Sequence, residues 1–229
     1  MACELVAITF DVDDPVGVAR FWAALLGREV VDDALGLRVL GTAAQVGLGF
    51  ERATTPRGEA PELVHLHLTS DGVGQDTTVA RVLDLGGRHL DVGQRPEEGH
   101  VVLADPAGDA LCVLEEGNRF TAGCGPLGEV ACDGLREVGV FWSEALGWPL
   151  VWDDDGETAV QSPHGGTKIA WGGPPVAPRA GRGRQRFTLL AVGDHGAEAD
   201  RLVSLGATRS ADGGLADPAG DELVLLSPV

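Results

Sequence analysis

The sequence predicts an α+β protein built from two tandem domains, and two duplicated segments carry this prediction. FWAALLG at residues 21–27 recurs as FWSEALG at 141–147, and ADPAGD occurs at both 104–109 and 216–221. The segments follow the same order in both copies, at offsets of 120 and 112 residues. A repeat of this length indicates a duplicated domain rather than a short solenoid repeat.

In the first copy, the elements are expected in the order β-α-β-β-β, followed by the same order again. LVAITFDV at 5–12 is rich in β-branched residues, which favour a strand. Asp14 and Pro15 suit a helix start. Apolar residues at helical spacing extend this helix over 15–26, and Gly27 ends it. The other expected elements are a helix at 76–85 and strands at 28–32, 36–40, 45–51, 63–70, 88–92, 100–104 and 110–115.

The second copy repeats this plan. Its helices are expected at 134–146 and 196–204, and the DPAGD segment, whose Asp, Pro and Gly suit a type I turn, closes a hairpin at 214–226. Its remaining strands are expected near 149–153, 157–162, 167–172 and 186–192. We therefore divide the chain into a first domain at 1–117, a linker with the start of the second domain at 118–128, and a second domain at 129–229.

Composition and charge limit the classes of partner. The formal charge of −18 repels nucleic acid and anionic lipid over most of the surface. No apolar run approaches the roughly 18 residues that a membrane span requires, and the N-terminal segment lacks the features of a secretory signal. The four cysteines show no CxxC pairing, which favours reduced thiols in a cytoplasmic protein. The sequence thus predicts a cytoplasmic protein that binds neither nucleic acid nor membrane.

One basic segment is an exception to the acidic character of the chain. It can be interpreted as an anion clamp or as a solvated Gly- and Pro-rich loop. Its arginines are Arg179, Arg182, Arg184 and Arg186.

The order of FWxxxLG, VHLHL, LGG and ADPAGD resembles the glyoxalase-like domain, over nearly the whole chain and in both copies. This family belongs to the vicinal oxygen chelate superfamily, with glyoxalase I, bleomycin-resistance proteins and extradiol dioxygenases. The resemblance implies tandem glyoxalase-like domains, each of two βαβββ modules that form a curled, cup-shaped mixed sheet with helices outside. The family usually has Asn after DPxG, where this chain has Asp109 and Asp221, and either residue suits the turn.

The resemblance also implies where a divalent metal would be held in the first domain. The matching positions on the opening, middle and closing strands are Ala7, His65 and Cys112, and Glu51 is the candidate for a fourth ligand. His65 and His67 are two residues apart on a strand, so their side chains point to the same face. Iron, zinc, nickel or manganese could bind this type of side chain. The candidate ligands are His65, Glu51, His67 and Cys112.

Two observations weaken the expectation of a metal. Ala7 offers no ligand atom. The corresponding positions of the second copy are Leu127, Val224 and either Gln185 or Phe187, which do not form a standard ligand set. We therefore expect no standard metal site and no other cofactor.

The tryptophans suggest what the cup could hold. Trp22 and Trp142 occupy matched helix positions and are expected in the core. Trp152 and Trp171 lie on predicted strands without a tryptophan counterpart in the first copy. They are interpreted either as walls of a pocket for a flat, apolar ligand or as ordinary core residues. The candidate ligand-binding residues are His65, His67, Trp152, Trp171 and Gln185.

Two functions of different classes follow. The first is a glyoxalase/bleomycin-resistance-like protein that binds an apolar or aromatic small molecule in its cup without a standard metal site. The alternative is a divalent-metal-dependent lyase, isomerase or dioxygenase of the superfamily that uses His65. The residues leave open whether the protein is an enzyme. They also leave open whether it is a monomer or a homodimer, because a fused tandem could form internally the cups that single-domain relatives form between subunits.

Overall fold

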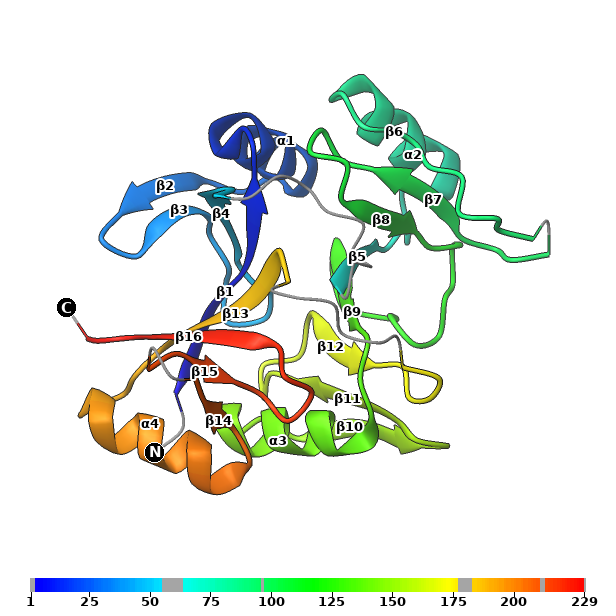
Figure 1. Cartoon of the computed structure of the whole chain (residues 1–229). Helices are drawn as coiled ribbons and strands as arrows, with labels where there is room; N and C mark the ends of the chain where they lie inside the picture. Colours follow the sequence, from blue (N-terminus) through cyan, green and yellow to red (C-terminus); the bar gives the residue numbers. More distant parts are fainter. Residues whose placement is uncertain (1–2, 55–63, 96, 177–182, 211–212, 229) are drawn as a thin grey trace.

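The protein folds into two eight-stranded mixed sheets with helices packed against them (Figure 1). The structure is a computed structural model, and the residues that it describes are 3–54, 64–95, 97–176, 183–210 and 213–228. The helices are α1 (Pro15–Leu26), α2 (Gln75–Asp84), α3 (Arg136–Leu146) and α4 (His195–Leu205). The predicted α+β class with repeated βαβββ modules is therefore confirmed.

The first sheet contains the opening and closing modules of the chain. Its strands are, in order across the sheet, β14 (Thr208–Arg209), β15 (Leu215–Ala216), β16 (Glu222–Leu226), β13 (Gln185–Leu190), β1 (Glu4–Val12), β4 (Leu48–Arg52), β3 (Gly36–Val39) and β2 (Val30–Asp33).

The second sheet contains the two middle modules. Its strands are, in order, β10 (Leu150–Asp154), β11 (Glu157–Gln161), β12 (Lys168–Trp171), β9 (Leu127–Cys132), β5 (Val64–Leu68), β8 (Ala110–Val113), β7 (Val101–Ala104) and β6 (Arg88–His89).

Each sheet therefore joins one module from each repeat. Strand β1 pairs with β13 antiparallel at the centre of the first sheet, and β5 pairs with β9 antiparallel at the centre of the second. Each cup is thus shared between the repeats. The two copies therefore pair within one chain (Figure 1).

The repeated motifs shape the helices and turns as expected. The Asp14 carboxylate accepts a hydrogen bond from the backbone N–H of Gly17 at 3.1 Å and caps α1. Gly27 ends α1 with a positive φ of 67°, which glycine adopts without strain. Trp22 and Trp142 are 2% and 0% exposed, so their prediction as core residues is confirmed.

Helix contacts within each repeat connect the two sheets. The Arg81 side chain on α2 donates to the carbonyl of Ala24 on α1 at 2.5 Å. In the second repeat, the Arg201 side chain on α4 donates to the carbonyl of Ala145 on α3 at 2.7 Å. Since α1 and α4 belong to the modules of the first sheet and α2 and α3 to those of the second, each repeat connects both sheets.

Arg179 and Arg182 of the basic segment lie outside the described residues. Arg184 donates from Nε to the backbone carbonyl of Asp11 at 3.0 Å, and Arg186 is also bound within the first sheet. These two side chains therefore take part in intramolecular contacts.

Within the described residues, no helix is long and apolar enough to cross a membrane.

Candidate functional site

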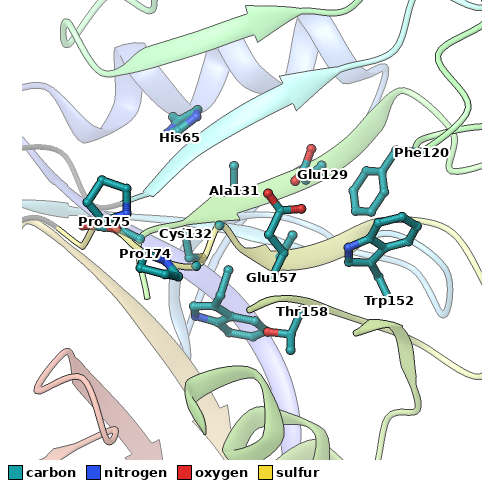
Figure 2. A pocket seen from close by; sticks show the side chains of 15 residues that line it. His65, Phe120, Glu129, Ala131, Cys132, Trp152, Glu157, Thr158, Pro174 and Pro175 are labelled. Carbon is teal, nitrogen blue, oxygen red and sulfur yellow. The ribbon is translucent and has the colours of Figure 1, made fainter. Parts of the chain in front are cut away.

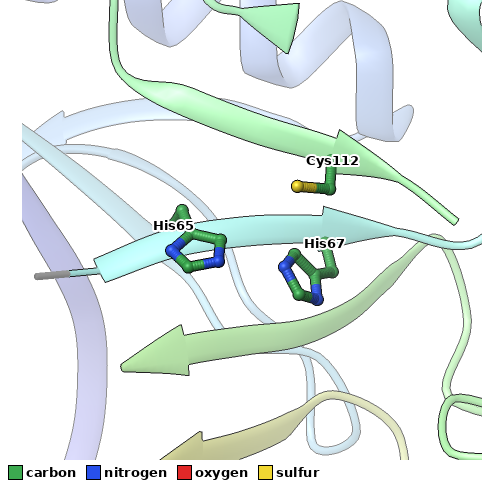
Figure 3. Close-up of side chains that lie close together, drawn as sticks. All are labelled: His65, His67 and Cys112. Atoms are coloured by element: carbon green, nitrogen blue, oxygen red, sulfur yellow. The ribbon is translucent and has the colours of Figure 1, made fainter. Parts of the chain in front are cut away.

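Strand β5 presents two histidines on one face of the second sheet. Along this strand, His65 and His67 are half-buried, whereas the alternating residues Val64, Leu66 and Leu68 are buried. The predicted period of two is therefore present, and both imidazoles lie on the same side of the strand (Figure 3). We call this side, which also carries Glu129 and Ala131 of β9, the cup face.

Three of the predicted ligands come together on the cup face. The candidate ligand atoms of His65, His67 and Cys112 all lie within 4.8 Å of one another (Figure 3). Cys112 of β8 stands directly opposite His67 in the strand register. The predicted grouping of these three side chains is thus present in the folded chain.

A carboxylate from the other repeat completes the cluster. Glu129 of β9 is opposite His67 on the other side of β5, and its Oε2 lies 2.7 Å from His67 Nδ1. Glu129 was not among the predicted site residues. The resemblance selected Leu127 instead, which is two residues earlier on β9 but is paired with Leu68, because the register shifts between His67 and Leu68.

The two imidazoles have opposite electrostatic character. Burial opposes the positive charge of His67, but hydrogen bonds with Cys112 and Glu129 outweigh this effect and raise its pKa to about 10. Burial lowers the pKa of His65 to about 4, and the charge of the neighbouring His67 lowers it further. Near neutral pH, the site therefore combines a neutral imidazole with an imidazolium held by a carboxylate.

The donor set of this cluster suits a transition metal. Two imidazoles, a thiol and a carboxylate are the ligands that zinc and related divalent ions prefer. The residues that would hold such an ion are His65, His67 and Cys112, and Glu129 would orient the His67 ring through its Nδ1 atom. Binding would have to displace the proton of the His67 imidazolium, because a metal ligates the neutral ring.

Glu51 does not join the cluster. It lies on β4 in the first sheet, where its carboxylate is 2.6 Å from Arg186. Arg186 also contacts Asp11 at 2.6 Å, and its side chain is 3% exposed. Attraction to this buried guanidinium explains the place of Glu51, and Glu129 provides the carboxylate beside His67 instead.

A cavity of about 550 Å³ opens beside His65 on the cup face (Figure 2). Its walls include aromatic side chains from Phe120 and Trp152, whose rings meet edge to face with centroids 6.1 Å apart. Trp152 is 42% exposed, an unusual position for so large an apolar side chain. Glu129 and Glu157 add carboxylates to the lining.

The other two predicted ligand-binding residues are placed differently. Trp171 contributes to the cavity lining but is 1% exposed, and its ring stacks on that of Phe187 with centroids 6.4 Å apart. Gln185 lies in the first sheet, where it is opposite Phe10 in the register. Its buried side-chain nitrogen has no hydrogen-bond partner within the part of the chain that the structure describes.

This combination of paired βαβββ modules around polar cup residues defines the class of the protein, which is the vicinal oxygen chelate fold. The family model for the glyoxalase-like domain matches residues 7–114 and again 129–226. The chain therefore belongs to the glyoxalase-like domain family, as its sequence motifs predicted. No curated protein matches its sequence.

Solved structures share the fold over the whole chain. Glyoxalase I from Zea mays superposes with a TM-score of 0.65 and 13% identity, covering 99% of this chain and 92% of that chain. A putative dioxygenase from Bacillus subtilis subsp. subtilis str. 168 superposes with a TM-score of 0.60 and 14% identity, covering 97% of this chain and 84% of the other. At these identities, the likeness concerns the fold.

Proposed function

We propose that the cup of the second sheet binds a small apolar or aromatic molecule. The observation that carries this proposal is the cavity of about 550 Å³ beside His65, a volume in the range of small-molecule sites. Aromatic walls with a few polar groups are typical of such sites, because the rings supply contact area and the polar groups fix orientation. Phe120 and Trp152 are among the aromatic lining residues, and His65 and Glu129 are among the polar ones.

Exposure of Trp152 supports this proposal. An indole that is 42% exposed retains much apolar surface that a ligand could cover. Covering apolar surface stabilises a complex by roughly 25 cal/mol for each Å² removed from water. A flat ligand that stacks on Trp152 would therefore gain binding free energy without any rearrangement of the sheet.

Tryptophan fluorescence tests this proposal. A panel of neutral aromatic compounds is titrated into the protein, and quenching and thermal shift are recorded. We expect binding by at least one compound and weakening of about tenfold in Trp152→Ala, since aromatic contacts dominate such sites. The matched control is Val151→Ala, because Val151 is similarly exposed at 40% but is not among the residues that line the cavity. A panel that produces neither quenching nor thermal shift would contradict the proposal.

A second candidate function is favoured by the cluster on the cup floor. Close grouping of His65, His67 and Cys112, with Glu129 beside His67, supports a divalent-metal-dependent enzyme of the vicinal oxygen chelate type. A bound divalent ion would act as a Lewis acid toward substrate oxygens. His65, which lines the cavity, would hold the ion next to a bound substrate, and the aromatic walls would exclude water from that substrate.

Cobalt titration tests the second candidate. A thiolate ligand gives Co²⁺ an intense near-ultraviolet charge-transfer band, so this band reports coordination by a cysteine. We expect near-stoichiometric binding in the native protein, loss of the band in Cys112→Ser and loss of affinity in His67→Ala. Glu51→Gln is the control and should bind Co²⁺ normally, because Glu51 contacts Arg186 in the first sheet. Absence of Co²⁺ binding in the native protein would rule out this candidate.

A further inference from the structure

Residues that pair with one another across successive strands of the second sheet form a row, which we call a register level. One such level crosses the cup face from one edge of the sheet, or rim, to the other. Leu66 pairs with Leu111, and extending this register by one residue places Ala110 beside His65. Ala110 pairs with Ala104, and Ala104 pairs with Arg88 at the rim. On the other side of His65, the residues at this level are Ala131, Ala170 and Ala159, and Trp152 stands at the opposite rim. Residues paired across neighbouring strands point to the same face. His65 is therefore flanked on both sides by methyl side chains.

Ala110, Ala131 and Ala170 are half-buried and leave a shallow trough beside His65, whereas Ala104 and Ala159 are 0% exposed. Neighbouring strands are about 4.8 Å apart, so Arg88, three strands from His65, lies roughly 14 Å away along the sheet. Ala110 and Ala131, on either side of His65, each line a cavity. A ligand in the cup could therefore extend from His65 toward either rim.

A second cavity occupies the Arg88 side of this trough. It measures about 660 Å³, and His65 lines it as well as the first cavity. Apolar side chains from Leu90, Val92 and Val102 form much of its wall. Val92 is 58% exposed, so this wall has apolar surface that a ligand could cover.

The charges around the two cavities differ in sign. Arg88 and His100 are the basic lining residues of the second cavity, and no Asp or Glu is among the described residues that line it. Glu129 and Glu157 line the first cavity. A lining with basic groups and without acids stands out in a chain with 35 acidic and 17 basic residues. An anion would thus meet a favourable local potential in the second cavity.

We propose that this second cavity, which we call the basic lobe, binds the anionic group of an apolar organic acid. The carboxylate or sulfonate of the ligand lies at Arg88, near His100, and its apolar body lies against Leu90, Val92 and Val102. The Arg88 guanidinium is oriented by a hydrogen bond from Nη1 to the backbone carbonyl of Asp105 at 3.2 Å. Arginine can donate two parallel hydrogen bonds to such an anion. This inference rests on the proposed function and specifies the ligand class of the same cup.

A pair of matched dyes tests the inference. 8-Anilinonaphthalene-1-sulfonate and N-phenyl-1-naphthylamine differ by one sulfonate, and both fluoresce more strongly in apolar surroundings. We expect both dyes to bind the native protein. Arg88→Met should weaken binding of the sulfonate about tenfold and change binding of the neutral dye less than twofold, because methionine keeps the apolar stem and removes the charge. His100→Gln should weaken binding of the sulfonate in the same direction.

Controls separate the inference from the proposed function. Arg20→Met makes the same change in net charge on the exposed side of α1 and should leave both affinities unchanged. If the native protein binds both dyes, but Arg88→Met changes the affinity for the sulfonate dye no more than Arg20→Met does, the proposed role of the basic lobe is overturned. The cup would remain a binding site in that case. Binding of neither dye by the native protein would overturn the inference together with the proposed function. Circular dichroism confirms that each variant is folded.

Discussion

The indole Nε1 of Trp22 donates a hydrogen bond to Oδ2 of Asp105 at 3.0 Å, and Trp142 makes the same bond to Asp217 at 3.0 Å. Trp22 lies on α1, which packs against the first sheet, whereas Asp105 lies in the β7–β8 turn of the second. In each repeat, the FW segment therefore supplies the donor of this hydrogen bond and the DPAGD segment supplies the acceptor. This contact joins the sheets within each repeat.

We expect Trp22→Phe to lower the free energy of unfolding by about 2 kcal/mol. The variant keeps an aromatic ring but leaves a buried acceptor without its donor, which costs about 1–3 kcal/mol. Trp142→Phe should have a similar effect, because its bond to Asp217 has the same length. Denaturant unfolding measures both, with Val16→Ala on an exposed position of α1 as a control. A loss no larger than that of the control would contradict a structural role for the bond.

The Asp105 carboxyl group makes stability depend on pH. Burial, together with the charge of Asp109, raises its pKa from 3.8 to about 6, although hydrogen bonds from Trp22 and backbone N–H groups oppose this shift. The folded state therefore binds the proton more tightly than the unfolded state. The resulting stabilisation is present in full below pH 4 and is lost as the pH rises to about 6, with a total of about 3 kcal/mol.

Asp105→Asn isolates this contribution, because the amide does not titrate. We expect the native protein to lose stability relative to the variant between pH 4 and pH 6, and the difference to become constant above about pH 7. Denaturant unfolding at closely spaced pH values measures the difference. Parallel curves for the two proteins over this range would show that the carboxyl group does not titrate with a raised pKa.

The ion pairs of the first sheet predict that loss of the buried Arg186 costs more stability than loss of its exposed partner Glu51. Arg186 is 3% exposed and contacts Asp11, which is 14% exposed, and Glu51, which is 62% exposed. Arg186→Met should cost about 3 kcal/mol, because it leaves the Asp11 carboxylate buried without its counter-ion. Glu51→Gln should cost less than about 1 kcal/mol, since exposed ion pairs contribute little. Similar losses in both variants would contradict this division, which thermal and denaturant unfolding can measure.

Local residue patterns predicted much of the fold and part of the candidate site. The spacing of His65 and His67 placed both imidazoles on one face, and the repeated FW and DPAGD segments indicated two copies of one domain. Glu129 was missed because it reaches His67 only when β9 pairs with β5, a contact between residues from different repeats. Glu51 was selected by its strand position, but a buried Arg186 more than a hundred residues away determines its contacts. Sequence periodicity specifies on which face of a strand a side chain lies, but it does not specify which strand pairs with it.

Pairing of modules across the repeats predicts that the two halves of the chain need each other. The strand pairs β1–β13 and β5–β9 lie at the centres of the two sheets, so a separate repeat would expose an unpaired edge in each. We expect fragments 1–117 and 118–229, when co-expressed, to copurify as a one-to-one complex with the far-UV circular dichroism of the intact chain. Glu116 and Gly117 are exposed, so a break between residues 117 and 118 should not disturb the core. The paired control is a break after Leu66 in buried β5, which should prevent assembly. Fragments that each fold as stable monomers and ignore one another would contradict the shared cups.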